Sequence, residues 1–181
     1  DLVAHELLFR DDESNEAHIL DADLATSNVL LDAFTSIQSA TSTGKHPVFI
    51  NVTRNLILSA SVSNSIDSRL VFEYSAKHGL DDKLVAAIID FSKKGFKFAI
   101  CNVTDWQKYE DLLSEISYVK VNALEHNFPL FRDNAILVKQ HKAKLIGEKV
   151  EDTQAFEVCK EVGCDHFQGF FLTKPQIIKG R

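Results

Sequence analysis

The sequence has no methionine, only three cysteines and no long apolar run, and the last two features exclude whole classes of protein. A membrane-spanning helix needs about 18 or more consecutive apolar residues, and no segment approaches that length. The cysteines, Cys101, Cys159 and Cys164, are odd in number and lack CxxC spacing, which favours reduced thiols over a disulfide framework or a zinc site. No basic segment followed by an apolar core opens the chain, so no secretory signal is visible and we expect a cytoplasmic protein.

Positive charge is also scarce. The chain has 20 Lys and Arg against 26 Asp and Glu, which gives a formal net charge of −6. Binding to nucleic acid or to an anionic membrane depends on clustered Lys and Arg, so we expect neither as a partner. The 181 residues, 45% of them hydrophobic, are enough for one globular domain. No linker, internal repeat or low-complexity tract divides residues 1–181, so we expect a single domain.

Strand-like segments alternate with helical ones along the chain. Helical periodicity predicts helices over 21–37, 81–94, 105–113, 129–142 and 152–162. Short apolar runs predict strands over 2–9, 48–52, 69–74, 96–102, 118–122, 144–150 and 166–172. This alternation is typical of a mostly parallel sheet, and seven strands in one small domain predict an α/β barrel or near-barrel.

Six of the predicted strands carry a polar residue where a buried parallel strand should be apolar throughout. Buried Lys and Glu are costly unless they are paired or bind a ligand. Because ligands bind at the carboxyl ends of barrel strands, we interpret the six as lining one shared cavity. They are Glu6, Asn51, Glu73, Lys120, Glu148 and Gln168.

The segments around these residues resemble, in order along the chain, the motifs of the EAL domain family. Glu-Leu-Leu-Phe-Arg at 6–10 resembles the Glu-Ala-Leu-x-Arg motif that names the family. Further resemblances lie in Phe-Ile-Asn-Val-Thr at 49–53, Val-Phe-Glu-Tyr at 71–74, Tyr-Val-Lys-Val-Asn at 118–122, Gly-Glu-Lys-Val-Glu at 147–151 and Phe-Gln-Gly-Phe at 167–170. The sequences of these motifs are most similar to those of the subgroup in which an EAL domain precedes an HDOD domain.

The resemblance implies an α/β fold, a TIM-like (β/α) barrel with one antiparallel strand. Active members hydrolyse cyclic di-GMP with Mg²⁺ or Mn²⁺. The resemblance implies that Lys120 orients or activates the attacking water and that the Arg10 guanidinium contacts a substrate phosphate. Gln168 would contact the bound ligand or join the metal ligands, which match Glu6, Asn51, Glu73 and Glu148.

Three positions depart from the family pattern at the centre of the site. Active members carry Asp-Asp-Phe-Gly after the fourth strand, where this chain has Cys101 and Asn102, and Asn122 replaces the aspartate that follows the strand lysine. Mg²⁺ prefers carboxylate oxygens, a thiol is the wrong donor, and a neutral amide supplies no charge. We therefore expect no bound metal, with Lys120 and the remaining metal-ligand positions vestigial and joined in an internal salt-bridge network.

Three hypotheses follow for function. The first is a degenerate EAL signalling module that acts through other proteins or an attached HDOD domain, with cyclic di-GMP binding left open and a homodimer expected by analogy alone. The second is a working phosphodiesterase with an altered metal site. The third is an unrelated barrel enzyme that uses Lys120 or Cys101 as a nucleophile. By the same resemblance, we expect the chain to lack the first strand of the family barrel, to stop where an HDOD domain would follow, and so to be a fragment of a longer protein.

Overall fold

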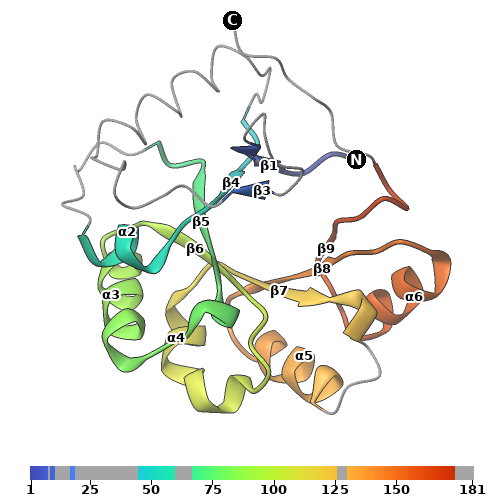
Figure 1. The fold of residues 1–181 in the computed structure, drawn as a ribbon. Coiled ribbons are helices and arrows are strands. Elements are labelled where there is room, and N and C mark those ends of the chain that lie inside the picture. Colours follow the sequence, from blue (N-terminus) through green and yellow to red (C-terminus); the bar gives the residue numbers. More distant parts are fainter. Residues whose placement is uncertain (8, 11–16, 19–44, 60–66, 126–129, 174–181) are drawn as a thin grey trace, which may run out of the picture.

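Seven parallel strands form one sheet that curls into a half-barrel (Figure 1). The computed structural model describes residues 1–7, 9–10, 17–18, 45–59, 67–125 and 130–173. The spatial order of the sheet is β1-β4-β5-β6-β7-β8-β9, which follows the chain. Its strands are β1 (His5–Leu7), β4 (Val48–Asn51), β5 (Leu70–Ser75), β6 (Lys97–Cys101), β7 (Tyr118–Asn122), β8 (Lys144–Glu148) and β9 (His166–Phe167).

The only antiparallel pairing in the described part of the chain is a short ribbon of β2 (Phe9–Arg10) and β3 (Ala17–His18). The seven-stranded sheet itself is parallel at every described junction, from β1 beside β4 to β8 beside β9. The α/β, TIM-like fold expected from the alternating pattern is therefore confirmed. The one antiparallel barrel strand implied by the resemblance is not among the described residues.

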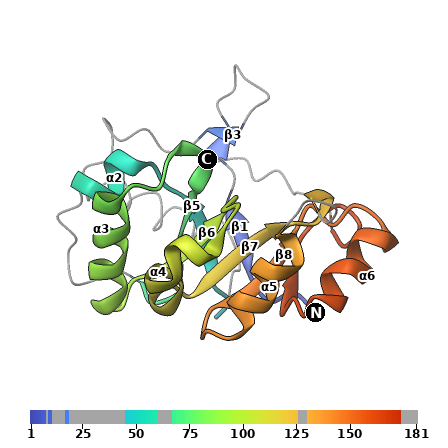
Figure 2. The same cartoon turned by 90° about the horizontal axis from the view of Figure 1, so that it is seen from below.

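The helices line the outer side of the curled sheet (Figure 2). Asp152 begins α6 as predicted, since its side chain accepts a hydrogen bond from the Ala155 N–H. Asp105 likewise accepts from the Gln107 N–H, but the predicted helix over 105–113 is divided between η2 and α4. The described helices are α2 (Arg54–Ser59), α3 (Asp82–Lys93), α4 (Glu110–Glu115), α5 (Phe131–Lys139) and α6 (Thr153–Glu161), with 3₁₀ turns η1 (Ala76–His78), η2 (Trp106–Tyr109) and η3 (Ala123–Glu125).

Of the predicted elements, one lies outside the described residues and another is shorter than predicted. The predicted helix over 21–37 lies outside the described residues. The predicted strand over 166–172 is wrong in its second half, because β9 ends at Phe167 and the chain then turns. The cause is a close approach at Gly169, where the Phe171 N–H donates to the Val150 carbonyl and the Thr173 N–H donates back to the Gly169 carbonyl.

Helices cover the outer face of the sheet (Figure 2). On the outer face, buried residues of the strands such as Ile100 and Leu145 pack with Leu84 and Ile88 of α3 and with Leu112 of α4. In the part of the chain that the structure describes, no helix is long and apolar enough to cross a membrane.

Candidate functional site

The strand side chains on the inner face of the sheet form two layers, and the candidate site is the second of them. A smaller apolar cluster holds Phe49, Val71, Ala99 and Ile146, with Ala4 and Tyr118 against it. Because strand side chains alternate between faces, the residue two positions further along each strand points to the same side. Those residues are Glu6, Asn51, Glu73, Cys101, Lys120 and Glu148, so an apolar floor lies beneath a polar layer nearer the carboxyl ends of the strands.

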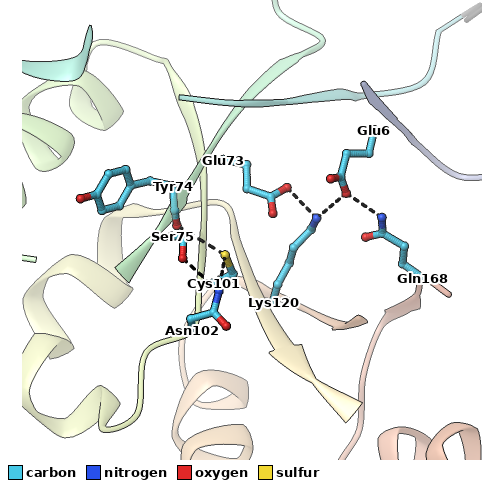
Figure 3. Close-up of polar contacts among 8 residues, drawn as sticks. All are labelled: Glu6, Glu73, Tyr74, Ser75, Cys101, Asn102, Lys120 and Gln168. Atoms are coloured by element: carbon cyan, nitrogen blue, oxygen red, sulfur yellow. Dashed lines mark hydrogen bonds and ion pairs between the residues drawn. The ribbon is translucent and has the colours of Figure 1, made fainter. Parts of the chain in front are cut away.

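Lys120 is the centre of this polar layer. Its Nζ lies 2.7 Å from Oε2 of Glu6 and 2.5 Å from Oε2 of Glu73, and only 4% of the residue is exposed (Figure 3). The ammonium group also lies 5.4 Å from the centre of the Phe49 ring, which belongs to the apolar floor. One buried cation therefore joins carboxylates from β1 and β5 to the middle of β7.

The remaining polar residues extend the same cluster across the opening of the half-barrel. The Nε2 of Gln168, just past β9, donates to Oε2 of Glu6 at 2.6 Å (Figure 3). Asn51 also hydrogen-bonds the Glu6 carboxylate. β1 and β9 are the two edge strands of the sheet, so the hydrogen bond between Gln168 and Glu6 joins these edges through side chains. Glu148 on β8 is held electrostatically by Lys120.

The carboxylates of this cluster differ in acidity. Burial raises the pKa of Glu73 to about 7, because the attraction of Lys120 is partly cancelled by repulsion from Glu6 and Glu148. Burial alone would raise the pKa of Glu6 as well, but Lys120 and the hydrogen bonds from Gln168 and Asn51 lower it overall. Burial also raises the pKa of Glu148, against the opposing pull of Lys120 and Lys149. Glu6 is thus the firm anion of the cluster.

Lys120 stays positively charged throughout the physiological range. Burial alone would lower the pKa of Lys120, but attraction to Glu73 and Glu6 outweighs burial and raises it above the ordinary value. Burial, reinforced by the charges of Glu73 and Glu148, raises the pKa of the Cys101 thiol to about 12. Neither side chain is an activated nucleophile, which argues against the unrelated-enzyme hypothesis.

Cys101 and Asn102 make their side-chain hydrogen bonds with the end of β5 and with each other. The Cys101 thiol donates to the Tyr74 carbonyl oxygen at 3.7 Å, and Nδ2 of Asn102 donates to Oγ of Ser75 and approaches Sγ of Cys101, each at 3.1 Å (Figure 3). Asn102 has φ +58°, a left-handed conformation that asparagine tolerates better than most residues. These two positions therefore tie strand ends together.

Asn122 also has a local structural role. Its Oδ1 accepts from the Leu124 N–H at 3.1 Å and its Nδ2 donates to Glu125 at 3.0 Å, which shapes η3 directly after β7. Ser75 and Glu125 are neighbours of the site that were not among the predicted residues. Ser75 lies two residues past Glu73 on β5, so the alternation of side chains was the signal that places it there.

Two of the carboxylates that the resemblance implies as metal ligands contact Lys120. Among the described residues, no group of three or more His, Cys, Asp or Glu side chains could hold a metal ion. Glu6 and Glu73 already share the Lys120 ammonium, and Oε2 of the 4%-exposed Glu73 accepts no aligned hydrogen bond. The side chain of Arg10, expected to contact a phosphate, is not among the described ones, although its backbone pairs with Ala17.

Two residues of the loop after β6 have structural roles. Asp105 caps η2 and pairs with Lys108 at 3.4 Å. Trp106 is buried, and its backbone N–H donates to Oδ1 of Asn134, which attaches this loop to α5.

A parallel α/β half-barrel with a carboxylate cluster around a strand lysine defines a TIM-like class of domain. The family comparison makes this specific. The model of the EAL domain matches residues 13–175, and the chain belongs to the EAL domain family. That match starts after Glu6, so the place of Glu6 in the site rests on its contacts with Lys120 and Gln168.

Two curated relatives align along nearly the whole chain. The chain is 26% identical over 187 residues to the uncharacterized protein YuxH of Bacillus subtilis and 25% identical over 182 residues to the cyclic di-GMP phosphodiesterase CdgJ of Vibrio cholerae. Each alignment covers 99% of this chain, but only 45% of YuxH and 42% of CdgJ. The chain therefore spans less than half the length of these relatives.

Solved structures share the fold at lower identity. The Bacillus subtilis YkuI protein, with an EAL domain in complex with cyclic di-GMP and calcium, matches with a TM-score of 0.68 at 19% identity, over 99% of this chain and 53% of that chain. The EAL domain of Mycobacterium smegmatis DcpA matches with a TM-score of 0.66 at 18% identity, over 89% and 82% of the two chains. These likenesses establish the fold.

Proposed function

We propose that this chain is a degenerate EAL domain that regulates other proteins by contact and does not hydrolyse cyclic di-GMP. The observation that supports this most is the position of the Lys120 ammonium, which neutralises Glu6 and Glu73 from within the protein. A two-metal hydrolase needs bridging oxygens that hold its ions about 3.5–4 Å apart. Cys101 and Asn102 supply no carboxylate at the matching positions, and their polar atoms are engaged elsewhere.

A chain that does not hydrolyse cyclic di-GMP could still bind it as a receptor. Relatives such as YkuI were crystallised with cyclic di-GMP. In this chain, however, three glutamates of the polar layer face one lysine, and uncompensated carboxylates repel an anionic ligand. Calorimetry with cyclic di-GMP, with and without Mn²⁺, separates a receptor from a scaffold. We expect no heat of binding in either condition. Metal-independent binding would identify a receptor, and binding only with Mn²⁺ would contradict the account of the site.

A working phosphodiesterase with an altered site is the second candidate. It is favoured by the similarity to CdgJ and by the retention of Glu6, Asn51, Glu73, Lys120 and Glu148 on strands of one sheet. For partners, we propose other signalling proteins, an attached HDOD domain or a second copy of the chain. The free cysteines in the described residues accord with a cytoplasmic location, which we also propose.

Restoring the two missing acids should create a cation site. The double variant Cys101→Asp with Asn102→Asp is expected to bind Mn²⁺ on the order of tenfold or more tightly than the parent, because hard divalent ions gain affinity with each carboxylate ligand. Titration of Mn²⁺ by calorimetry, supported by a thermal shift on adding the ion, measures the change. Thr104→Asp adds a carboxylate at an exposed site three residues beyond Cys101 and serves as the charge control.

The single variant Asn102→Asp guards against a failure to fold, because position 102 is only half-buried and aspartate tolerates its left-handed backbone. If the single and double variants fold and bind Mn²⁺ no better than Thr104→Asp, the loss of acids at 101 and 102 is not what sets cation affinity.

A further inference from the structure

Cys159 and Cys164 meet where α6 ends. The Cys164 N–H donates to the Cys159 carbonyl at 3.0 Å and the Gly163 N–H donates to the Lys160 carbonyl at 3.1 Å, with Gly163 at φ +83°. This pair of bonds is the Schellman motif, in which the residues at the positions of Cys159 and Cys164 place their side chains in contact. The backbone of the helix end therefore brings the two thiols together.

The sulfur positions agree with this geometry. A Cβ built on Gly147 of β8 would lie 2.7 Å from Sγ of Cys159 and 3.5 Å from Sγ of Cys164. Both sulfurs therefore lie against the same residue of the strand. The two thiols hydrogen-bond each other. Cys159 is fully buried, whereas Cys164 is partly exposed, which leaves the pair open to solvent from one side.

We propose that Cys159 and Cys164 form a reversible thiol–disulfide modification site, closed by an oxidant of the peroxide class. One sulfur, as thiolate, attacks a peroxide oxygen; the O–O bond breaks, leaving a sulfenic acid, and the released hydroxide takes a proton to become water. The second sulfur then attacks the sulfenic sulfur, the S–S bond forms and the sulfenic oxygen leaves as a second water. Two thiols are thereby oxidised and one peroxide is reduced to two waters, and a reducing dithiol reverses the change.

The third cysteine provides an internal control. Cys101 is buried, its thiol donates to the Tyr74 carbonyl, and burial raises its pKa to about 12, so it should stay reduced under the same treatment. In the pair, Cys164 is partly exposed and open to the oxidant, and the sulfur of Cys159 lies beside it. The site is independent of whether the EAL domain hydrolyses or binds a nucleotide.

Trypsin can resolve the proposed bond because Lys160 lies between the two cysteines. The folded protein is treated with hydrogen peroxide and then unfolded in denaturant, so that every remaining thiol, including the buried Cys101, is alkylated. The digest is analysed by mass spectrometry without reductant. We expect the peptide ending at Lys160 to be joined to the peptide that follows it, with Cys101 alkylated. Dithiothreitol should separate the two peptides, and Cys101→Ser should leave the joined species unchanged.

The variant Cys164→Ser should yield no joined peptide while keeping the far-ultraviolet spectrum of the parent. The proposal is overturned if all three thiols remain alkylatable after peroxide. It is equally overturned if the bond forms through Cys101, or if the joined peptides appear only in a disulfide-linked dimer.

Discussion

Replacing Lys120 with methionine should lower the free energy of unfolding by about 3–5 kcal/mol at pH 8, because it removes one partner of a buried ion pair and leaves the others uncompensated. Methionine keeps most of the side-chain volume, so the loss reports charge and not a cavity. The exposed pair of Lys94 with Asp90, at 2.6 Å, supplies the matched control. Lys94→Met should cost no more than about 0.5 kcal/mol. Denaturant unfolding of both variants measures the difference.

The penalty for Lys120→Met should shrink at pH 5. Glu73, with a pKa of about 7, is already protonated there, and Glu6 can take up a proton once its cation is gone. In the parent protein, the folded state holds the Glu73 proton up to about pH 7 whereas the unfolded state loses it near the ordinary value of 4.5. The contribution of Glu73 to the free energy of unfolding therefore falls by about 3 kcal/mol as the pH rises from 4.5 to about 7.

The variant Glu73→Gln isolates that contribution, since it should flatten the decline of stability between pH 5 and pH 7. The account fails if Lys120→Met costs less than about 1 kcal/mol at pH 8, or the same amount at both pH values, because burial of paired charge would then not dominate the cluster.

Gly169→Ala is the second substitution with a large expected effect. A Cβ at this position would overlap the backbone N, C and O atoms of Val150, and backbone atoms cannot rotate away as a flexible side chain does. We expect a loss of about 3 kcal/mol or more, at or beyond the upper end of overpacking penalties. The substitution should also separate the Gln168 carbonyl from the Val150 N–H, now 2.9 Å apart.

Unfolding by urea measures this loss, and Phe170→Ala is the control. Phe170 is the next residue in the same turn and is 62% exposed, so its truncation should change stability by no more than about 0.5 kcal/mol. Equal stabilities for the two variants would mean that the turn after β9 can move away from Val150 without cost.

The sequence allowed the fold and the composition of the site to be predicted because both follow from local patterns. The period-two alternation placed Glu73, Lys120 and Glu148 on their strands, and the order of strands implied a shared cavity. A salt-bridge network was expected in that cavity, but the carboxylates that contact the lysine could not be identified from the sequence. Lys120 contacts Glu6 and Glu73 at hydrogen-bonding distance, whereas Glu148 acts on it only electrostatically, and this depends on strand stagger and the curl of the sheet.

The features that the sequence did not predict depend on contacts that form only in the folded chain. The predicted strand over 166–172 continued past Phe167 because its residues are apolar, and the approach of Gly169 to Val150 that ends it joins positions far apart in sequence. Likewise, Asn122 could be recognised as a missing aspartate, but its local bonds to Leu124 and Glu125 depend on the turn after β7. The contact of Cys159 with Cys164 could only be understood once the end of α6 was known.

Incubation of the purified chain with cyclic di-GMP and Mn²⁺, followed by chromatographic detection of the linear dinucleotide, tests the central claim most directly. We expect no linear product above a no-protein control, because the Lys120 ammonium and the substitutions at Cys101 and Asn102 leave no built site for two ions. Sustained multiple turnover that disappears in Glu6→Gln would contradict it, since the carboxylate paired with Lys120 would then be serving a hydrolytic centre.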